Sequence, residues 1–386
     1  MNGWRILMED KILVKYEVYG DEAPPPPPPT FDFKATTGDP ISMGLFGVFD
    51  GHGDGGFASN YIATNVWDKL QSQPDWTSAY HGCNSESTTT LLSSIITQAY
   101  HDLDEDLRDD KTKPSSDGGS TAIMALVCDR YLFVANVGDS RCILVKRKMA
   151  MIVEEGDVAA TSESRNKPCW GSSEIDIIPM SEDHKPNLPE ERARIEAAGL
   201  TVQTDYVPSD SDDGQTIAIH RVKKSNTELL GVARAFGDYD FKSNDNLSAH
   251  RQAVVCTPDI VVRERMDDED MFLILACDGI WDVMSNQEVG EFVARRVAER
   301  LDEVSSIHNK IKNNNTVQGE VLARVGDDLL ALCLEKKSRD NMSVLIVAFP
   351  ASGLNTSEPS LSARGEDEKS SANLSSAVRT LTLAFE

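Results

Sequence analysis

Basic residues are scarce in this chain of 386 residues, which has 38 Lys and Arg against 63 Asp and Glu and a formal net charge of −25. Such an acidic surface repels a phosphate backbone, so the balance argues against a nucleic-acid partner and suits a protein that collects divalent cations. The chain also lacks any apolar run near the roughly 20 residues that cross a bilayer, and its first residues lack the apolar core of a signal peptide. We therefore expect no membrane span.

Paired cysteines are absent as well. The seven cysteines are odd in number, widely spaced and form no C-x-x-C pair, which argues against a disulfide framework and against a zinc site. No clear basic import cluster stands out either. These absences indicate a soluble protein of a reducing compartment, in the cytoplasm, the nucleus or both, and we expect a monomer.

Three polar segments look like additions to one folded domain that spans residues 1–350. A proline-rich insert lies at about 20–40, a polar insert at about 146–173, and a tail at 351–386. The tail has no apolar stripe until its last few residues, so we expect it to be disordered, with a docking segment as the alternative.

Between these segments, short apolar runs alternate with longer helical patterns. The predicted strands are 44–49, 121–127, 132–137, 142–145, 215–222, 271–277 and 343–349. The predicted helices are 57–71, 91–107, 189–198, 286–301 and 319–336. Ser285 and Glu288 have the spacing of a capping box at the start of the fourth helix, and Gly199 is the residue type that closes the third.

Aspartates fall where predicted strands end. One apolar run stops at Asp50-Gly51, and a second stops in the same way at Asp278-Gly279. A glycine directly after the aspartate lets the backbone turn sharply and exposes its carbonyl, so that side chain and main chain can both bind a hard cation. Each Asp-Gly pair taken alone is more simply an ordinary turn.

Further charged residues accompany these pairs. Asp139 lies in a turn between two strand runs that we interpret as a hairpin, and Asp340 lies just before the last predicted strand. Near the start, Arg5 precedes Glu9 and Asp10. Taken by themselves, Glu9 and Asp10 could be a solvated pair of charges. We expect these residues to converge at one end of a sheet.

The joint occurrence of oxygen ligands with one arginine and one histidine matches a particular chemistry. Oxygen-only ligation selects Mg²⁺ or Mn²⁺ over Zn²⁺. Two such ions about 3.5 to 4 Å apart can share a water, lower its pKa and aim it at phosphorus. A guanidinium such as that of Arg5 can hold phosphate oxygens, and an imidazole such as that of His52, alone more often a surface or core residue, can protonate the departing alkoxide.

Eight stretches resemble the metal-dependent protein phosphatases of the PP2C (PPM) family, in the family's order and from residue 3 to about 349. They are GWRILMED (3–10), GVFDGHG (47–53), GGSTA (118–122), VANVGDSRCIL (134–144), SEDHKP (181–186), ARAFGD (233–238), LACDGIWDV (275–283) and SRDNMSV (338–344). The resemblance implies an α+β fold, a four-layer α-β-β-α sandwich of two antiparallel sheets with a helical pair on each outer face.

The resemblance also implies a metal centre of two Mg²⁺ or Mn²⁺ ions. Asp50 would bridge the two ions, and Asp278 and Asp340 would complete the first. Glu9 and the Gly51 carbonyl would help to hold the second.

The remaining roles follow in the same way. Arg5 would clamp phosphate and His52 would be the general acid. Asp139 and Asp282 match positions that in some members hold a looser third ion, although a helix-start or turn residue is an equal alternative for Asp282. The residues expected close to the metals are Asp10 and Thr121.

Two features depart from the family or vary within it. Only Met1 and Asn2 precede the 3–10 block, where the family usually has a strand, so either the sequence is truncated or the sheet lacks an edge strand. An acidic loop at about 205–214 lies where the family carries a variable flap near the substrate groove.

We therefore predict a protein serine/threonine phosphatase that acts on phosphorylated proteins through a bridging water, without a covalent phosphoenzyme. One alternative keeps the fold and removes the catalysis, leaving a catalytically weak binding or inhibitory module. Another is a metal-dependent phosphohydrolase that acts on a small phosphate ester, because a metal centre recognises the phosphate and not the leaving group.

Overall fold

A computed structural model of the chain describes Arg5 and residues 7–18, 42–114, 118–148, 174–208, 216–307, 314–352, 354 and 379–383. The proline-rich insert at about 20–40, the polar insert after residue 148 and residues 209–215 of the acidic loop lie outside the described residues. Within the described ranges, no helix combines the length and the apolar character needed to cross a membrane.

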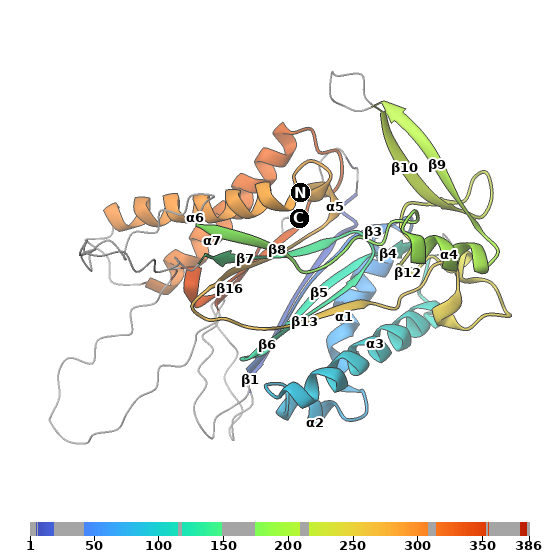
Figure 1. Ribbon diagram of the computed structural model, residues 1–386, viewed down its shortest axis with the longest axis horizontal. Coiled ribbons are helices and arrows are strands. Elements are labelled where there is room, and N and C mark those ends of the chain that lie inside the picture. Colours follow the sequence, from blue (N-terminus) through green and yellow to red (C-terminus); the bar gives the residue numbers. More distant parts are fainter. Residues whose placement is uncertain are drawn as a thin grey trace, which may run out of the picture.

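Two antiparallel sheets pack face to face at the centre of the molecule, each with five strands in the described ranges (Figure 1). The first sheet has the order β1-β2-β5-β6-β13, with bounds Lys11–Val18, Ser42–Phe49, Ala122–Val127, Tyr131–Val137 and Asp259–Glu264. The second has the order β16-β15-β14-β7-β8, with bounds Arg379–Leu383, Val344–Ala348, Asp270–Ala276, Arg141–Arg147 and Ile175–Pro179.

The central strands are apolar at nearly every position because both faces of each sheet are buried. In β14, Leu273 and Leu275 pack into the core between the two sheets. Their neighbours Phe272 and Ile274 point the other way and pack under helices. Successive side chains of one strand therefore serve two different cores.

Helices cover the outer face of each sheet (Figure 1). The first sheet is covered by α1 (Phe57–Gln71), α2 (Trp76–His81) and α3 (Glu86–Asp109). The second is covered by α6 (Asn286–Ile307) and α7 (Asn314–Glu335). This arrangement confirms the expected four-layer α-β-β-α sandwich.

Helix α1 shows why these segments are helical. Ile62, Val66 and Leu70 are spaced four apart, lie on one face and are fully buried against the first sheet. Burial of each such side chain stabilises the fold by about 1.5–3 kcal/mol. Truncation of Ile62 to alanine would cost about 2–5 kcal/mol.

A smaller unit stands apart from the sandwich (Figure 1). It consists of α4 (Pro189–Ala197) and the strands β9 (Thr201–Pro208), β10 (Thr216–Lys223) and β11 (Leu229–Leu230), which share a small core of their own. Gly199 follows α4 with a φ of 94°, the left-handed conformation expected for a helix-closing glycine. The capping box of α6 is confirmed too, since the Ser285 amide donates to Glu288 at 2.8 Å.

Three features differ from expectation. Strands β6 and β7 do not form a hairpin, because β6 pairs with β5 and β13 whereas β7 pairs with β14 and β8. The turn at Asp139 therefore carries the chain from one sheet to the other. Strands β1, β8, β9 and β13 were not predicted. Within the tail expected to be disordered, Arg379–Leu383 form β16 beside β15, and residues 355–378 lie outside the described residues.

Candidate metal centre

Acidic side chains from distant segments meet at one end of the sandwich. Asp50 follows β2, and Asp10 immediately precedes β1, its antiparallel partner. Oxygens of Asp10 and Asp50 and the Cys277 sulfur all lie within 4.8 Å of one another. Burial raises the pKa of Asp50 well above its usual range, and repulsion from Asp278, Asp10, Asp139 and Asp340 raises it further.

Asp278 shows the same crowding from the second sheet. It begins the short helix α5 (Asp278–Trp281) directly after β14. Burial raises the pKa of Asp278 well above its usual range, and so do Asp139, Asp282 and Asp340, while Lys185 opposes them. Asp50, Asp278 and Asp340 are thus close enough for their charges to interact.

Two buried carboxylate oxygens in this cluster lack hydrogen-bond partners among the described residues. They are Asp10 Oδ1 and Asp278 Oδ1. Buried polar atoms are normally satisfied, and crowded carboxylates are stable as anions only beside positive charge. Unsatisfied oxygens among like charges are the donor set that a hard divalent cation needs, so these residues fit Mg²⁺ or Mn²⁺.

The Cys277 thiol does not alter that conclusion. Burial raises its pKa well above the usual value, and the nearby Asp10 and Asp50 raise it further, so it stays protonated. Its sulfur lies 3.4 Å from the Asn341 carbonyl, to which the thiol donates, and it accepts from the Ser343 amide at 3.2 Å. A protonated thiol is a poor metal ligand, which leaves oxygen ligands only.

Glycines follow Asp50 and Asp278 because other backbone comes close. A Cβ on Gly51 would lie 2.6 Å from the Glu9 carbonyl oxygen, and one on Gly279 would lie 2.0 Å from the Asn341 carbonyl oxygen. Close approach, and not the sharp turn that we expected, therefore requires both glycines.

Polar neighbours hold the first carboxylates in place. Ser343 Oγ donates to Asp10 Oδ2 at 2.8 Å, and the Asp50 amide donates to Thr121 Oγ1 at 3.3 Å. The Thr121 amide donates in return to the Asp50 carbonyl at 2.9 Å. Thr121 thus lies beside Asp50, and its place near the metals stays a prediction.

Arg5 and Glu9 approach the cluster from the N-terminal segment. Arg5 Nη2 donates to Asp340 at 2.5 Å, and its side chain is 55% exposed. The Glu9 carboxylate accepts instead from the Gly55 amide at 3.0 Å, while its own amide donates to Asn341 Oδ1 at 2.9 Å. Metal ligation by Glu9 and by the Gly51 carbonyl stays a prediction.

His52 faces a carboxylate that the sequence reasoning did not assign. Its Nε2 lies 2.9 Å and 3.0 Å from the two oxygens of Asp238. A small sheet of β3 (Gly51–His52), β4 (Gly119–Ser120) and β12 (Phe236–Gly237) brings the two residues together. Burial alone would lower the pKa of His52, but Asp238 raises it to about 9. The contact with Asp238 therefore favours the protonated imidazole.

A lysine occupies the neighbourhood of the expected third ion. Lys185 Nζ lies 2.5 Å from Asp139 Oδ2, and Asp139 and Asp278 oppose the lowering effect of burial and raise the lysine pKa. Asp282 directly follows α5 as a turn residue, and its amide donates to the Asp278 carbonyl at 2.8 Å. Burial raises the pKa of Asp282, and Asp139 contributes in the same direction. Asp282 is thus both a turn residue and a member of the cluster.

The sequence carried a signal for both unassigned residues. Asp238 ends the ARAFGD stretch, and Lys185 lies in the SEDHKP stretch, two of the stretches that resemble the PP2C family. A charged side chain inside such a stretch is a candidate site residue. Its partner could not be identified, because His52 and Asp238 are 186 positions apart.

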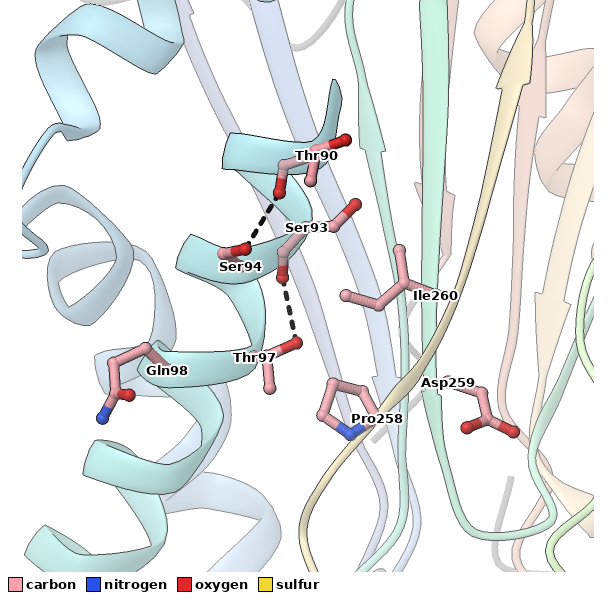
Figure 2. A pocket seen from close by; sticks show the side chains of 8 residues that line it. All are labelled: Thr90, Ser93, Ser94, Thr97, Gln98, Pro258, Asp259 and Ile260. Carbon is pink, nitrogen blue, oxygen red and sulfur yellow. Dashed lines mark hydrogen bonds between the residues drawn. The ribbon is translucent and has the colours of Figure 1, made fainter. Parts of the chain in front are cut away.

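A groove of about 570 Å³ lies between α3 and the start of β13, away from the carboxylate cluster (Figure 2). Its lining residues are Thr90, Ser93, Ser94, Thr97, Gln98, Pro258, Asp259 and Ile260. Ser94 Oγ donates to the Thr90 carbonyl at 3.0 Å and Thr97 Oγ1 donates to the Ser93 carbonyl at 2.9 Å, so these hydroxyls are satisfied within their own helix. The groove shares no lining residue with the carboxylate cluster, so we place the chemistry at the cluster.

Comparison with solved structures supports the fold. A phosphatase from a pathogenic strain of Toxoplasma gondii superposes with a TM-score of 0.54 at 22% identity, over 90% of this chain and 89% of that one. Serine-threonine phosphatase 2C from Toxoplasma gondii gives a TM-score of 0.55 at 19% identity, over 86% and 98%. At these identities the likeness shows the fold alone.

Comparison with curated sequences reaches further. Protein phosphatase ppm-1.A of Caenorhabditis elegans is 31% identical over 360 residues, which cover 91% of this chain and 58% of that protein. Protein phosphatase 1A of Mus musculus is 28% identical over 91% of this chain and 69% of the relative. The family described as Protein phosphatase 2C matches residues 1–342. This chain therefore belongs to the protein phosphatase 2C family.

Proposed function

We propose that the chain is a protein serine/threonine phosphatase that hydrolyses phosphoserine and phosphothreonine at a centre of two Mg²⁺ or Mn²⁺ ions. One observation carries the proposal. Asp10 and Asp278 each hold a buried oxygen without a partner among the described residues, beside carboxylates that raise the pKa of Asp50 and Asp278. Kinship with proteins named protein phosphatases adds independent support.

Asp10, Asp50, Asp278 and Asp340 would hold the ions, with Glu9 and the Gly51 carbonyl as further ligands. When bound, such ions lower the pKa of a shared water and neutralise charge on the phosphate. Arg5 is half-exposed beside Asp340, so its guanidinium can swing between that carboxylate and the oxygens of an incoming phosphate. It thereby orients the phosphoryl group over the cluster.

His52 supplies the proton for the leaving group. Asp238 accepts from Nε2, which leaves Nδ1 to donate to the departing serine or threonine oxygen. The Asp238 carboxylate stabilises the imidazolium and fixes its orientation. A serine alkoxide is a poor leaving group, so this protonation matters more for a phosphopeptide than for an activated aryl phosphate.

Phosphopeptide hydrolysis tests the proposal. The purified chain should release phosphate from a phosphothreonine peptide with Mn²⁺, and not with EDTA. Asp50→Asn should abolish turnover, whereas Glu105→Gln, which removes one exposed charge on α3, should not. Binding of Mn²⁺ without turnover would favour the inhibitory or binding module. Faster hydrolysis of small phosphate esters than of phosphopeptides would favour the small-ester enzyme.

A further inference from the structure

A buried aspartate on α3 contacts the segment that carries Asp238. Asp104 is 7% exposed, and its Oδ1 accepts from the Gly237 amide at 2.8 Å. Its main-chain carbonyl accepts from the Tyr239 hydroxyl at 2.7 Å. Asp104 therefore binds the residues on both sides of Asp238.

A buried lysine completes this contact. Lys242 Nζ donates to Asp104 Oδ2 at 2.8 Å and to the Ala235 carbonyl at 2.8 Å. The ammonium and the carboxylate neutralise each other in a site where neither side chain is more than 10% exposed. Together they bind residues 235, 237 and 239, which we call the 235–239 turn.

The 235–239 turn needs such support because its backbone is strained. Gly237 has a φ of 71°, and Asp238, which is not a glycine, has a φ of 49°. A residue held in the left-handed region persists only where surrounding contacts fix it. One more contact comes from the Asp238 amide, which donates to the Gly118 carbonyl at 2.9 Å.

The position of the Asp238 side chain depends on this turn. A Cβ on Gly119 would lie 2.3 Å from Asp238 Oδ2, so the carboxylate packs directly on the β4 backbone and has little room to move. Relaxation of the 235–239 turn would therefore withdraw the carboxylate from His52.

We infer that Asp104 is a positioning residue for the proton donor, because this aspartate, its charge neutralised by Lys242, holds the 235–239 turn in the conformation that directs Asp238 at His52. The inference rests on the proposed function, in which His52 protonates the leaving group. It adds a requirement for Asp104, which lies outside the carboxylate cluster.

Two double variants distinguish the effect of the hydrogen bond to the Gly237 amide from the effect of removing two buried charges. Asp104→Asn with Lys242→Met removes both charges but keeps an oxygen that accepts from the Gly237 amide. Asp104→Leu with Lys242→Met removes both charges and that oxygen. Asp102→Asn is the matched control, because Asp102 lies on the same helix and, among the described residues, accepts hydrogen bonds from Gln73 and Gln98 and not from the 235–239 turn.

The readout is the ratio of kcat on phenyl phosphate to kcat on p-nitrophenyl phosphate, since only the first needs a proton donor. The leucine variant should lower this ratio at least about tenfold, and the asparagine variant and the control less than about threefold. Equal losses on both substrates, or equal ratios in the two double variants, would overturn the inference. Should the leucine variant fail to fold, Asp104→Ser with Lys242→Met takes its place, because the serine hydroxyl is too short to reach Gly237. The same ratios then apply to this variant.

The His52 side-chain proton gives a readout that does not depend on activity. In ¹⁵N-histidine-labelled protein, NMR can follow the exchange of the His52 Nε2 proton with solvent. This proton should be protected from exchange in the wild type and the asparagine variant, and the protection should be lost in the leucine variant. Protection that survives in the leucine variant would overturn the inference and leave the proposed function standing. A wild type with this protection pattern but no phosphatase activity would instead refute the proposed function alone.

Discussion

Asp50→Asn should stabilise the protein in the absence of divalent cations while it removes the stabilisation that those cations provide. Asp50 lies among Asp10, Asp278, Asp139 and Asp340, and burial and these neighbours raise its pKa well above the usual range. An acid whose folded-state pKa is raised destabilises the fold at pH values above its unfolded-state pKa, where the unfolded chain is charged freely. Removal of the charge relieves that cost.

The size of the gain follows from the geometry. Oxygens of Asp10 and Asp50 lie within 4.8 Å. At an effective dielectric constant of about 20, two full charges at that separation repel by about 3 kcal/mol. Because raised pKa values leave the pair partly protonated, the net gain should be about 1–3 kcal/mol, or about 1–4 °C in Tm for a chain of this size.

Thermal unfolding followed by circular dichroism at pH 7 checks this prediction in EDTA and in Mn²⁺. The variant should melt above the wild type in EDTA. The difference should shrink as the pH falls from the raised folded-state pKa and should vanish below about 4, where Asp50 is protonated in both states. In Mn²⁺ the wild type should gain stability and the variant should gain much less. Glu105→Gln controls for net charge. A variant that melts below the wild type in EDTA, or gains as much from Mn²⁺, would refute the reasoning.

Three further substitutions test other parts of the account. Asp238→Asn should lower kcat on a phosphothreonine peptide about 10- to 100-fold and affect p-nitrophenyl phosphate much less, whereas equal losses would contradict a role in proton donation. Gly279→Ala places a Cβ 2.0 Å from the Asn341 carbonyl oxygen, so it should destabilise the fold in urea by about 1–3 kcal/mol or more, while Gly231→Ala, which meets nothing within 4 Å, should not. Glu288→Gln should cost about 0.5 kcal/mol at pH 7, since Glu288 is half-exposed and its contacts with Lys336 and Ser285 are screened by solvent. The pKa of Glu288 is lowered to about 2, so this cost should fade below pH about 4.5 in urea titrations, and a constant cost would contradict it.

Local sequence patterns were sufficient to predict a helix or strand where the segment has one buried face and clear signals at its ends. Helix α1 has the predicted bounds Phe57–Gln71, and α6 begins at the predicted capping box. The buried strands β5 and β14 were found because burial on both sides makes them apolar throughout. β13 was missed because it is the last strand of its sheet within the described residues and exposes Val261 and Val262, which hides any alternation.

The spacing of residues along the sequence could not predict which distant segments meet in the fold. The turn at Asp139 joins two sheets, and a local pattern cannot distinguish that from a hairpin. We expected Asp10 near the metals but did not count it among their ligands. Its oxygen lies within 4.8 Å of an Asp50 oxygen, because the pairing of β1 with β2 places these two residues side by side. The contact of His52 with Asp238 likewise depends on three short strands that no periodicity predicts.

Anomalous diffraction from crystals grown with Mn²⁺ tests the central claim most directly. The account predicts two peaks at the manganese edge among the oxygens of Asp10, Asp50, Asp278 and Asp340, and none in crystals of Asp50→Asn at this position. Absence of manganese from the cluster in the wild type, or peaks only at other acidic surfaces, would contradict it.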